Sequence, residues 1–370
     1  MKYIFNVSPN LRQKQSTQKI MLELTIALLI VFGFSLAYYF QAYGMDYVIR
    51  ALVLMACSVL TALLTEVAFA FFMKKGAKFD LKYVGKFLNS SFGWITAIIL
   101  VLMTPISIRP FALIVSTFLC ILFGKLLFGG FGNNIFNPAA VGRAIIFATF
   151  MGATTDVVTT ATPTTTIATE FNWLVLDSDL ITEMMDAIGG LGTLFTGWYP
   201  GALGETSALL ILILGVILAI RKVIDWRIPT IYLRSIFVLT AAIALFRGVG
   251  SYGNLPGFIW YPLVHVLTGG VVFGAVFMLT DPVTSPTSAQ GKTIFALGAA
   301  IITVLIRIKA NLPEGCLYSI LMMNMLTPMI ERALDGKQLT LRKKAAFMFG
   351  GVAIVGLGSV LLAASAVQAK

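Results

Sequence analysis

The chain has 370 residues, of which 58% are hydrophobic and only 12% are charged, and its mean hydropathy is +0.91. This balance excludes a soluble globular protein and predicts an all-α integral membrane protein that lies in a lipid bilayer. The net charge of +11 is expected to set the topology of such a chain, and no nucleic-acid partner is needed to explain it.

Long stretches without charged residues mark the membrane helices. A helix needs about 20 apolar residues to cross the hydrocarbon core. The apolar stretches predict helices at 20–40, 47–73, 88–104, 110–128, 138–152, 203–220, 230–247, 262–280, 293–307, 314–331 and 346–366. The first ten form the expected bundle, and the last is an additional C-terminal helix. The polar N-terminus does not have the form of a secretory signal, so we expect the first helix to be retained.

The basic residues are distributed unevenly between the predicted loops. No Lys or Arg occurs from 144 to 220, whereas most basic residues cluster at 2–19, 74–86, 221–227 and 332–344. The positive-inside rule then predicts a cytoplasmic N-terminus and an acidic extracytoplasmic loop between the fifth and sixth helices. The expected segments are a cytoplasmic N-terminal segment (1–19), a first five-helix repeat (20–152), the extracytoplasmic loop (153–202), a second five-helix repeat (203–331), and a basic cytoplasmic linker with the additional helix (332–370).

Proline-rich phrases recur at a nearly constant offset and indicate an internal duplication. "LMTPISIRP" ends the third predicted helix and "MLTDPVTSP" ends the eighth, with Pro282 lying 177 residues after Pro105. Because five is an odd number, two five-helix copies face opposite ways across the membrane, as in many transporters. The alternative is that proline breaks simply recur between membrane helices. The agreement of the offsets favours two inverted repeats with broken helices.

The segment "FGGFGNNIFNPAAVGRA", residues 128–144, is the richest of these breaks. A helix that is interrupted in the membrane leaves backbone N–H and C=O groups free, and these must face protein, water or a ligand. Asn133, Asn134 and Asn137 supply amide donors and acceptors that suit a planar heterocycle with carbonyl and imide edges. The sequence therefore predicts a ligand site at this break.

A threonine cluster opens the acidic loop. "VVTTATPTTT", residues 157–166, contains six threonines in ten positions. Composition alone favours a solvated, β-prone loop, because threonine is stiff at χ1 and bonds to nearby backbone. Loops as long as this one are usually functional or disordered, so a role for the hydroxyl groups is the alternative.

Several phrases together resemble one family of redox pumps. They are "VSPNLRQKQSTQKIM", "FGGFGNNIFNPAAVGRA", "DVVTTATP", "PGALGETSALLILILG", "WRIP", "LTDPVTSPTSAQGK" and "LPEGCLYSILMMNMLTPMIER". In this order they resemble the D subunit of the Rnf complex, an ion-translocating ferredoxin:NAD oxidoreductase, and the related B subunit of the sodium-pumping NADH:quinone oxidoreductase. The short N-terminus is more similar to the former than to the latter.

The resemblance implies a flavoprotein subunit in the bacterial inner (cytoplasmic) membrane. Such a subunit passes electrons while Na⁺ or H⁺ is translocated, and it works with the A, B, C, E and G subunits rather than as a complete enzyme. The alternative function is a small-solute channel or secondary transporter, because inverted repeats with broken helices also serve transport.

The resemblance also implies two cofactors. The first is FMN, joined through its phosphate to the last residue of a Ser/Thr-Gly-Ala-Thr motif, which matches Thr159, Thr160, Ala161 and Thr162 here and makes Thr162 the attachment residue. Threonine is a poor nucleophile, so a transferase is expected to form the ester, and no catalytic residue is assigned. The family places "LGETSALL", with Glu205 and Thr206, close to this FMN. It places a second, non-covalent flavin (riboflavin) near Asn134, Asn137 and Asp281.

Other polar residues have competing interpretations. Glu205 and its neighbours Thr206 and Ser207 either cap the sixth helix or lie beside the flavin. Glu23 and Glu66 are either ion ligands or, for Glu23, an interfacial partner of Lys19. The remaining expectations are that His265 is a packed helix residue, that Lys125 reaches the inner surface, and that the three cysteines are small core residues and not a metal or disulfide site.

Overall fold

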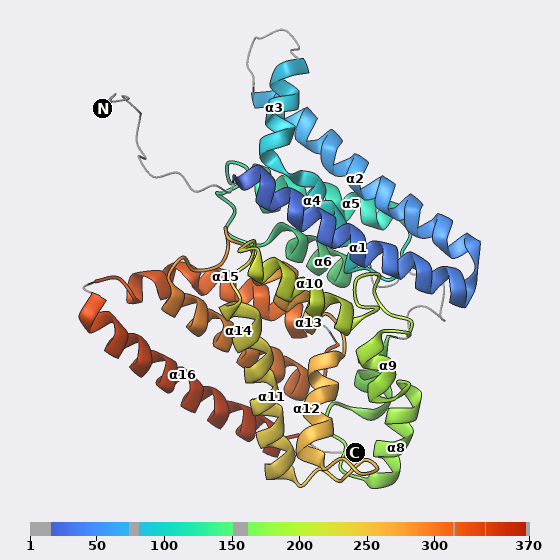
Figure 1. Cartoon of the computed structure of the whole chain (residues 1–370), viewed down its shortest axis with the longest axis vertical. Coiled ribbons are helices and arrows are strands. Elements are labelled where there is room, and N and C mark those ends of the chain that lie inside the picture. Colours follow the sequence, from blue (N-terminus) through green and yellow to red (C-terminus); the bar gives the residue numbers. More distant parts are fainter. Residues whose placement is uncertain (1–15, 74–80, 151–161, 314, 337, 368–370) are drawn as a thin grey trace.

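The computed structural model describes residues 16–73, 81–150, 162–313, 315–336 and 338–367. Every regular element in these ranges is a helix, as the composition predicted. The first half of the chain contains α1 (Thr17–Tyr43), α2 (Met45–Met73), α3 (Leu81–Ser91), α4 (Gly93–Leu102), α5 (Pro110–Ile121), the π-helical η1 (Leu122–Leu126) and α6 (Pro138–Thr149). Figure 1 shows these elements together in the blue and cyan part of the molecule.

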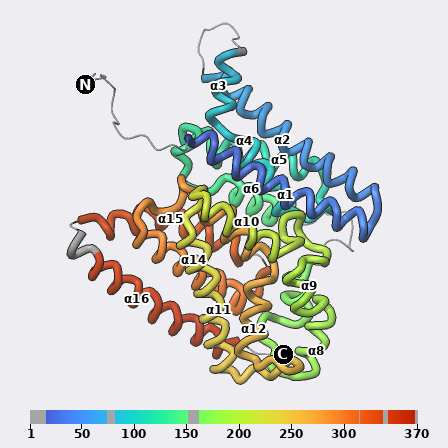
Figure 2. The backbone as a smooth tube through the Cα atoms, viewed as in Figure 1, coloured from blue at the N-terminus to red at the C-terminus, as the bar shows by residue number. Residues whose placement is uncertain are grey.

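The second half contains α10 (Ala208–Ile220), α11 (Arg227–Arg247), α12 (Gly257–Leu267), α13 (Val271–Phe273), the π-helical η4 (Gly274–Met278), α14 (Ala289–Ala310), α15 (Gly315–Ala333) and α16 (Gln338–Ser365). The halves meet where α6 packs against α15 and where α10 packs against α1 (Figure 2).

Five helices are long and apolar enough to cross a membrane: α1, α2, α11, α14 and residues 342–365 of α16. The number rises to seven when two bent pairs are each counted as one span. The other apolar helices, α5 with η1, α6 and α10, are shorter than a full span. The chain is therefore a multi-pass membrane protein whose described residues form five to seven candidate spans, whereas the sequence predicted ten helices and an additional C-terminal one.

Two predicted helices are broken in the structure. The predicted helix 88–104 is the pair α3 and α4, bent by 46°, and the predicted helix 262–280 is the pair formed by α12 and the segment α13–η4, bent by 67°. Phe92 lies at the first bend with a φ of 56°, and Gly269 lies at the second with a φ of 67°. A left-handed residue cannot continue an α-helix, which is why each apolar run divides there.

The segment between the halves is helical, although its composition favoured a β-prone loop. It contains α7 (Pro163–Thr166), the π-helical η3 (Ile167–Phe171), α8 (Ser178–Ala187) and α9 (Gly190–Thr196). Pro163 occupies the first position of α7, where a helix needs no N–H from that residue. In Figure 1, α8 and α9 lie at one side of the molecule beside α12.

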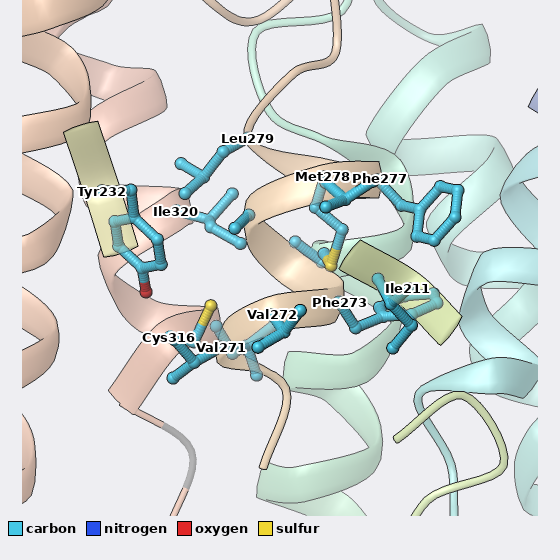
Figure 3. Close-up of a cluster of buried hydrophobic side chains, with 14 of the residues drawn as sticks. Ile211, Tyr232, Val271, Val272, Phe273, Phe277, Met278, Leu279, Cys316 and Ile320 are labelled. Atoms are coloured by element: carbon cyan, nitrogen blue, oxygen red, sulfur yellow. The ribbon is translucent and has the colours of Figure 1, made fainter. Parts of the chain in front are cut away.

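The short α13–η4 segment is surrounded by side chains from three other helices. Ile211 of α10, Tyr232 of α11 and Ile320 of α15 point toward it (Figure 3). Cys316 lies so close that a Cβ at Gly274 would be 2.5 Å from its Sγ. Cys120 and Cys316 are buried in the core, as predicted, whereas Cys57 is half-buried.

The C-terminal helix α16 begins at Gln338, earlier than the predicted residue 346. It packs along α11 and α14 at the edge of the second half (Figure 1). A Cβ at Gly356 would lie 2.2 Å from Ile301 of α14, so the glycine permits the close approach of the two helices. Arg247 at the end of α11 donates to the carbonyl of Ala364 at 2.6 Å.

Candidate functional site

A cavity lies where the bend between α3 and α4, the break at 128–137 and the turn after η4 come together. We call it the break cavity. Its lining residues are Ile20, Met21, Leu24, Phe92, Ile95, Thr96, Ile99, Lys125, Phe131, Asn134, Asn137, Pro138, Ala139, Val223, Ile224, Phe277, Thr280, Asp281, Pro282 and Val283. The structure therefore brings together Asn134, Asn137 and Asp281, which the sequence placed at one site. Most of the other lining side chains are apolar or aromatic, and polar groups are few, as is typical of a small-molecule site.

Asn137 connects the two halves at this cavity. Its Oδ1 accepts hydrogen bonds from Ala139 N at 3.1 Å and Ala140 N at 3.3 Å, so it is the N-cap of α6. Its Nδ2 donates to Met278 O at 3.3 Å, and its backbone N–H donates to Asn324 Oδ1 at 3.0 Å. Both of these partners belong to the second half, so the position of Asn137 depends on the assembled bundle.

The other two asparagines of the break differ in exposure. Asn134 is buried, and its Nδ2 donates to Phe136 O at 3.1 Å. Asn133 is exposed, bonds only to Gly129 O at 3.3 Å among the described contacts, and does not line the break cavity. The sequence treated the three alike, whereas the structure brings only Asn134 and Asn137 to the cavity.

Asp281 follows η4 in a tight turn on the other side of the cavity. Its Oδ1 accepts from Val283 N at 3.1 Å, and its Oδ2 accepts from Thr284 Oγ1 at 3.2 Å. These local bonds hold the carboxylate at the wall, where the preceding apolar helix ends. An acidic residue after a long uncharged run was the sequence signal for this position.

Lys125 is buried in the cavity wall, contrary to the prediction that it reaches the inner surface. Its side chain is 2% exposed and its Nζ lies 3.1 Å from Oε1 of Glu66, which is 0% exposed. Nζ also donates to the carbonyl of Ser91 at the end of α3. Sequence analysis missed this pairing because the residues are 59 positions apart, although each is a charged residue within a long apolar stretch.

The predicted attachment residue, Thr162, begins the threonine segment, by which we mean residues 162–166. Its Oγ1 accepts from Thr165 N at 3.3 Å and lies 3.0 Å from Thr164 Oγ1 and 2.9 Å from Thr165 Oγ1. Thr162 is half-buried and is the N-cap of α7, and its carbonyl accepts from Thr166 N at 3.0 Å, so its described hydrogen bonds come from residues within four positions. The predicted motif residues Thr159, Thr160 and Ala161 lie outside the described residues.

The threonine segment docks against the break between α12 and α13. A Cβ at Gly269 would lie 2.6 Å from Thr164 Cγ2, so only glycine permits this contact. At the adjacent Gly270, a Cβ would lie 3.1 Å from Glu205 Oε1. At this break, Gly269 therefore contacts the threonine segment and Gly270 contacts Glu205, the predicted flavin-contact residue.

The end of α14 stabilises this arrangement. Arg307 is almost fully buried, donates to Thr268 O at 2.9 Å, and lies with its guanidinium carbon 4.5 Å from the centroid of the Trp173 ring. Asn311 donates to Ala168 O at 2.6 Å, which fixes η3 directly after the threonine segment. Neither residue was singled out from the sequence. The available sequence signal was an arginine near the end of an apolar helix.

Glu205 does not cap a helix. α10 begins at Ala208, not at 203, and its N-cap is Ser207, whose Oγ accepts from Leu210 N at 3.2 Å. Glu205 precedes the helix in a turn, with its N–H donating to Ala202 O at 2.9 Å. Thr206 is fully buried, and its Oγ1 lies 3.0 Å from Ser35 Oγ of α1.

A second hollow lies beside the threonine segment, and we call it the α7 hollow. Its lining residues are Pro163, Thr166, Asp186, Ala187, Ile188, Gly189, Thr193, Trp198, Tyr199 and Pro200. Thr162 directly precedes this lining, and Trp198 is 43% exposed at its edge. An aromatic group tethered to Thr162 would therefore have an aromatic side chain within the same hollow.

Two further expectations have clear outcomes. Glu23 accepts bonds of 2.9 and 2.8 Å from Arg221, a partner that was not predicted, and Lys19 adds a second favourable positive charge. His265 is buried between the rings of Trp173 and Tyr261, which confirms that it is a packed helix residue. Within the described ranges, no cluster of three or more His, Cys, Asp or Glu side chains is arranged to hold a metal ion.

Comparison with known proteins gives a match over most of the chain. Residues 4–340 match the model of the NQR2, RnfD, RnfE family. The matched range ends close to the start of α16, so most of the C-terminal helix lies beyond it.

Individual relatives agree with this match. The chain is 33% identical to the D subunit of the proton-translocating ferredoxin:NAD(+) oxidoreductase complex of Clostridium ljungdahlii, over 90% of this chain and 95% of that protein. It is 34% identical to the D subunit of the Na(+)-translocating ferredoxin:NAD(+) oxidoreductase complex of Acetobacterium woodii, over 88% and 91%. It is 34% identical to the B subunit of the Na(+)-translocating NADH-quinone reductase of Chromohalobacter salexigens, over 67% and 59%.

Proposed function

The chain belongs to the NQR2, RnfD, RnfE family, and from this premise we propose that it is the membrane flavoprotein subunit of an Rnf-type complex. Such a complex couples electron transfer between ferredoxin and NAD to the translocation of Na⁺ or H⁺. The A, B, C, E and G subunits would supply the remaining redox centres. Relatives of nearly equal identity carry names with either ion, so the proposal includes both.

The observation that carries the proposal is the composition of the break cavity. A flavin ring needs apolar walls for its faces and a few donors and acceptors for its carbonyl and imide edge. The cavity offers Phe92, Phe131 and Phe277 as walls and the buried amides of Asn134 and Asn137 as polar groups. These residues fit a non-covalent flavin, which the resemblance implies to be riboflavin, with Asp281 on the other side of the cavity.

The second proposed cofactor is FMN, esterified to Thr162. The support is an accessible hydroxyl at the N-cap of a short helix, next to a hollow that has an exposed tryptophan. Glu205, and Thr206 behind it, would lie on the far side of the same helix break. A bound flavin supplies electron-transfer chemistry that no side chain of this chain provides. The protein's own residues would bind, orient and shield the ring.

The proposal also includes the orientation and the inverted repeat. Each half has two helices, a bent helix pair and two further helices in this order, which supports a duplication. An odd number of spans per copy would make the copies inverted, with the break cavity on the cytoplasmic face and Thr162 on the opposite face. Both Ser178 and Lys222 are exposed. In a cysteine-free background, Ser178→Cys should react with an impermeant maleimide in intact cells and Lys222→Cys only in opened ones. The reverse result would contradict the orientation.

One experiment separates the proposed function from a solute transporter. The natively assembled complex is purified, run on a denaturing gel under ultraviolet light, and extracted with acid. The proposal expects a fluorescent band for this chain and released riboflavin in the extract. A complex that contains neither flavin would contradict the redox function, and solute transport would then be the better account of a cavity between two broken helices.

A further inference from the structure

A buried ion pair lies directly at the wall of the break cavity. Lys125 lines the cavity, whereas Glu66, its partner at 3.1 Å, is not among the lining residues and lies behind it. Lys125 belongs to the π-helical segment η1, and π-helical turns within α-helices are frequent at functional sites. The ammonium group is therefore nearer to the cavity than the carboxylate that balances it.

The neighbours of Glu66 hold its carboxylate behind the Lys125 ammonium group as seen from the cavity. Ser91 donates from its Oγ to Glu66 Oε1 at 2.5 Å, and its carbonyl accepts from Lys125 Nζ. Gly93 leaves the space that the carboxylate occupies, since a Cβ there would lie 2.3 Å from Glu66 Oε1. Glu66 Oε2 has no hydrogen-bond partner within the described residues. The break between α3 and α4 thus holds both charges in place.

We propose that Lys125 tunes the reduction potential of the flavin in the break cavity and that Glu66 is a positioning residue that limits this effect. The inference rests on the proposed non-covalent flavin. A positive charge beside a flavin ring favours the electron-rich reduced form, and it acts strongly where water is excluded. The negative charge behind it partly cancels this field. Asp281 is the other charged residue of the described lining, and it acts in the opposite sense to Lys125.

The test uses the whole purified complex and four versions of this chain: the natural chain, Lys125→Met, Glu66→Gln, and the double variant with both changes. The readouts are the content of acid-extractable flavin and its midpoint potential from a spectroelectrochemical titration. The double variant is included because removing one member of a buried ion pair destabilises more than replacing both. Lys86→Met is the control, since Lys86 is an exposed lysine on α3.

The inference predicts an ordered set of potentials. Lys125→Met and the double variant should lower the midpoint potential, Glu66→Gln should raise it, and Lys86→Met should leave it unchanged. A purely structural role would move both single variants in the same direction or only reduce the flavin content. If a single variant does not assemble, the double variant provides the test. A midpoint potential of the double variant equal to that of the natural chain would contradict the proposal.

Two negative results are distinguishable. Unchanged potentials in complexes that retain their extractable flavin would overturn the role of Lys125 alone. The absence of extractable flavin from the natural complex would instead overturn the proposed flavin site, and this inference with it.

Discussion

The break cavity and the threonine segment hold their polar groups in different ways. Asn137 at the cavity is bonded to Met278 and Asn324, which are more than 140 positions away in the sequence. The described hydrogen bonds of Thr162 all come from Thr164, Thr165 and Thr166, which lie within four positions of it. The cavity is thus built by the tertiary structure of both halves, whereas the environment of Thr162 is local.

This difference matches what each proposed cofactor requires. A flavin that is bound without a covalent bond needs walls and hydrogen-bonding groups that are already in place, because ordering them on binding would cost affinity. A covalent tether needs only an accessible hydroxyl on a segment that a transferase can reach. The comparison predicts that substitutions at the two regions have separable effects on the two flavins.

The largest expected effect is that of Thr162→Val. Valine keeps the β-branched shape but lacks the oxygen that the phosphoester requires, so covalent flavin on this chain should be lost completely. Extractable flavin should change little, whereas loss of the N-cap of α7 should lower stability by about 0.5–2 kcal/mol. In-gel fluorescence and acid extraction measure the two flavins. Thr169→Val is the matched control, because Thr169 is exposed and lies outside the α7 hollow, and it should keep its fluorescence. Loss of both flavins in Thr162→Val would show that the regions are not independent.

The next effect is at the cavity. Asn137→Leu removes the N-cap of α6, which is worth about 0.5–2 kcal/mol, together with the bond to Met278. We expect most of the extractable flavin to be lost while the covalent flavin remains. Asn133→Leu is the control, because that amide is exposed and lies outside the lining. Equal losses of extractable flavin in the two variants would show that Asn137 has no special role in the cavity.

An intermediate effect is expected where the threonine segment contacts the break between α12 and α13. Gly269→Ala places a Cβ against Thr164 at a φ of 67°, which adds a clash to backbone strain of about 1–2 kcal/mol. Gly248→Ala has nearly the same φ, 69°, and no atom within 4 Å, so it measures the strain alone. Flavin fluorescence per chain should fall for Gly269→Ala and not for Gly248→Ala. Similar fluorescence in both variants would contradict the docking of the threonine segment.

The smallest effect is that of Ser207→Ala. The change removes the bond from Leu210 N at the start of α10 and should lower stability by about 1 kcal/mol. Both flavins should remain, because Ser207 lines neither the break cavity nor the α7 hollow. Thermal unfolding measures the loss of stability, and flavin quantification measures both flavins. Selective loss of the covalent flavin would instead place Ser207 beside that flavin.

The helices were predicted well because apolar runs between charges are a local signal. The breaks at Phe92 and Gly269 were not predicted, since they depend on single left-handed residues within continuous apolar runs. The pairing of Asn137 with the second half and of Lys125 with Glu66 could not be predicted either, because tertiary packing alone brings these residues together. By contrast, the proposal of Thr162 as the attachment residue uses only a short motif in the sequence around it.

The most direct test of two separate flavin regions is the mass of the peptide that spans 144–221, which contains no Lys or Arg before its last residue. The protein is expressed natively with its transferase, digested with trypsin, and the peptide is fragmented. The account predicts one added FMN, less one water, located on Thr162, and the same adduct in the Asn137→Leu variant. An adduct on another threonine would move the attachment site, and an unmodified peptide from the natural chain would contradict the account.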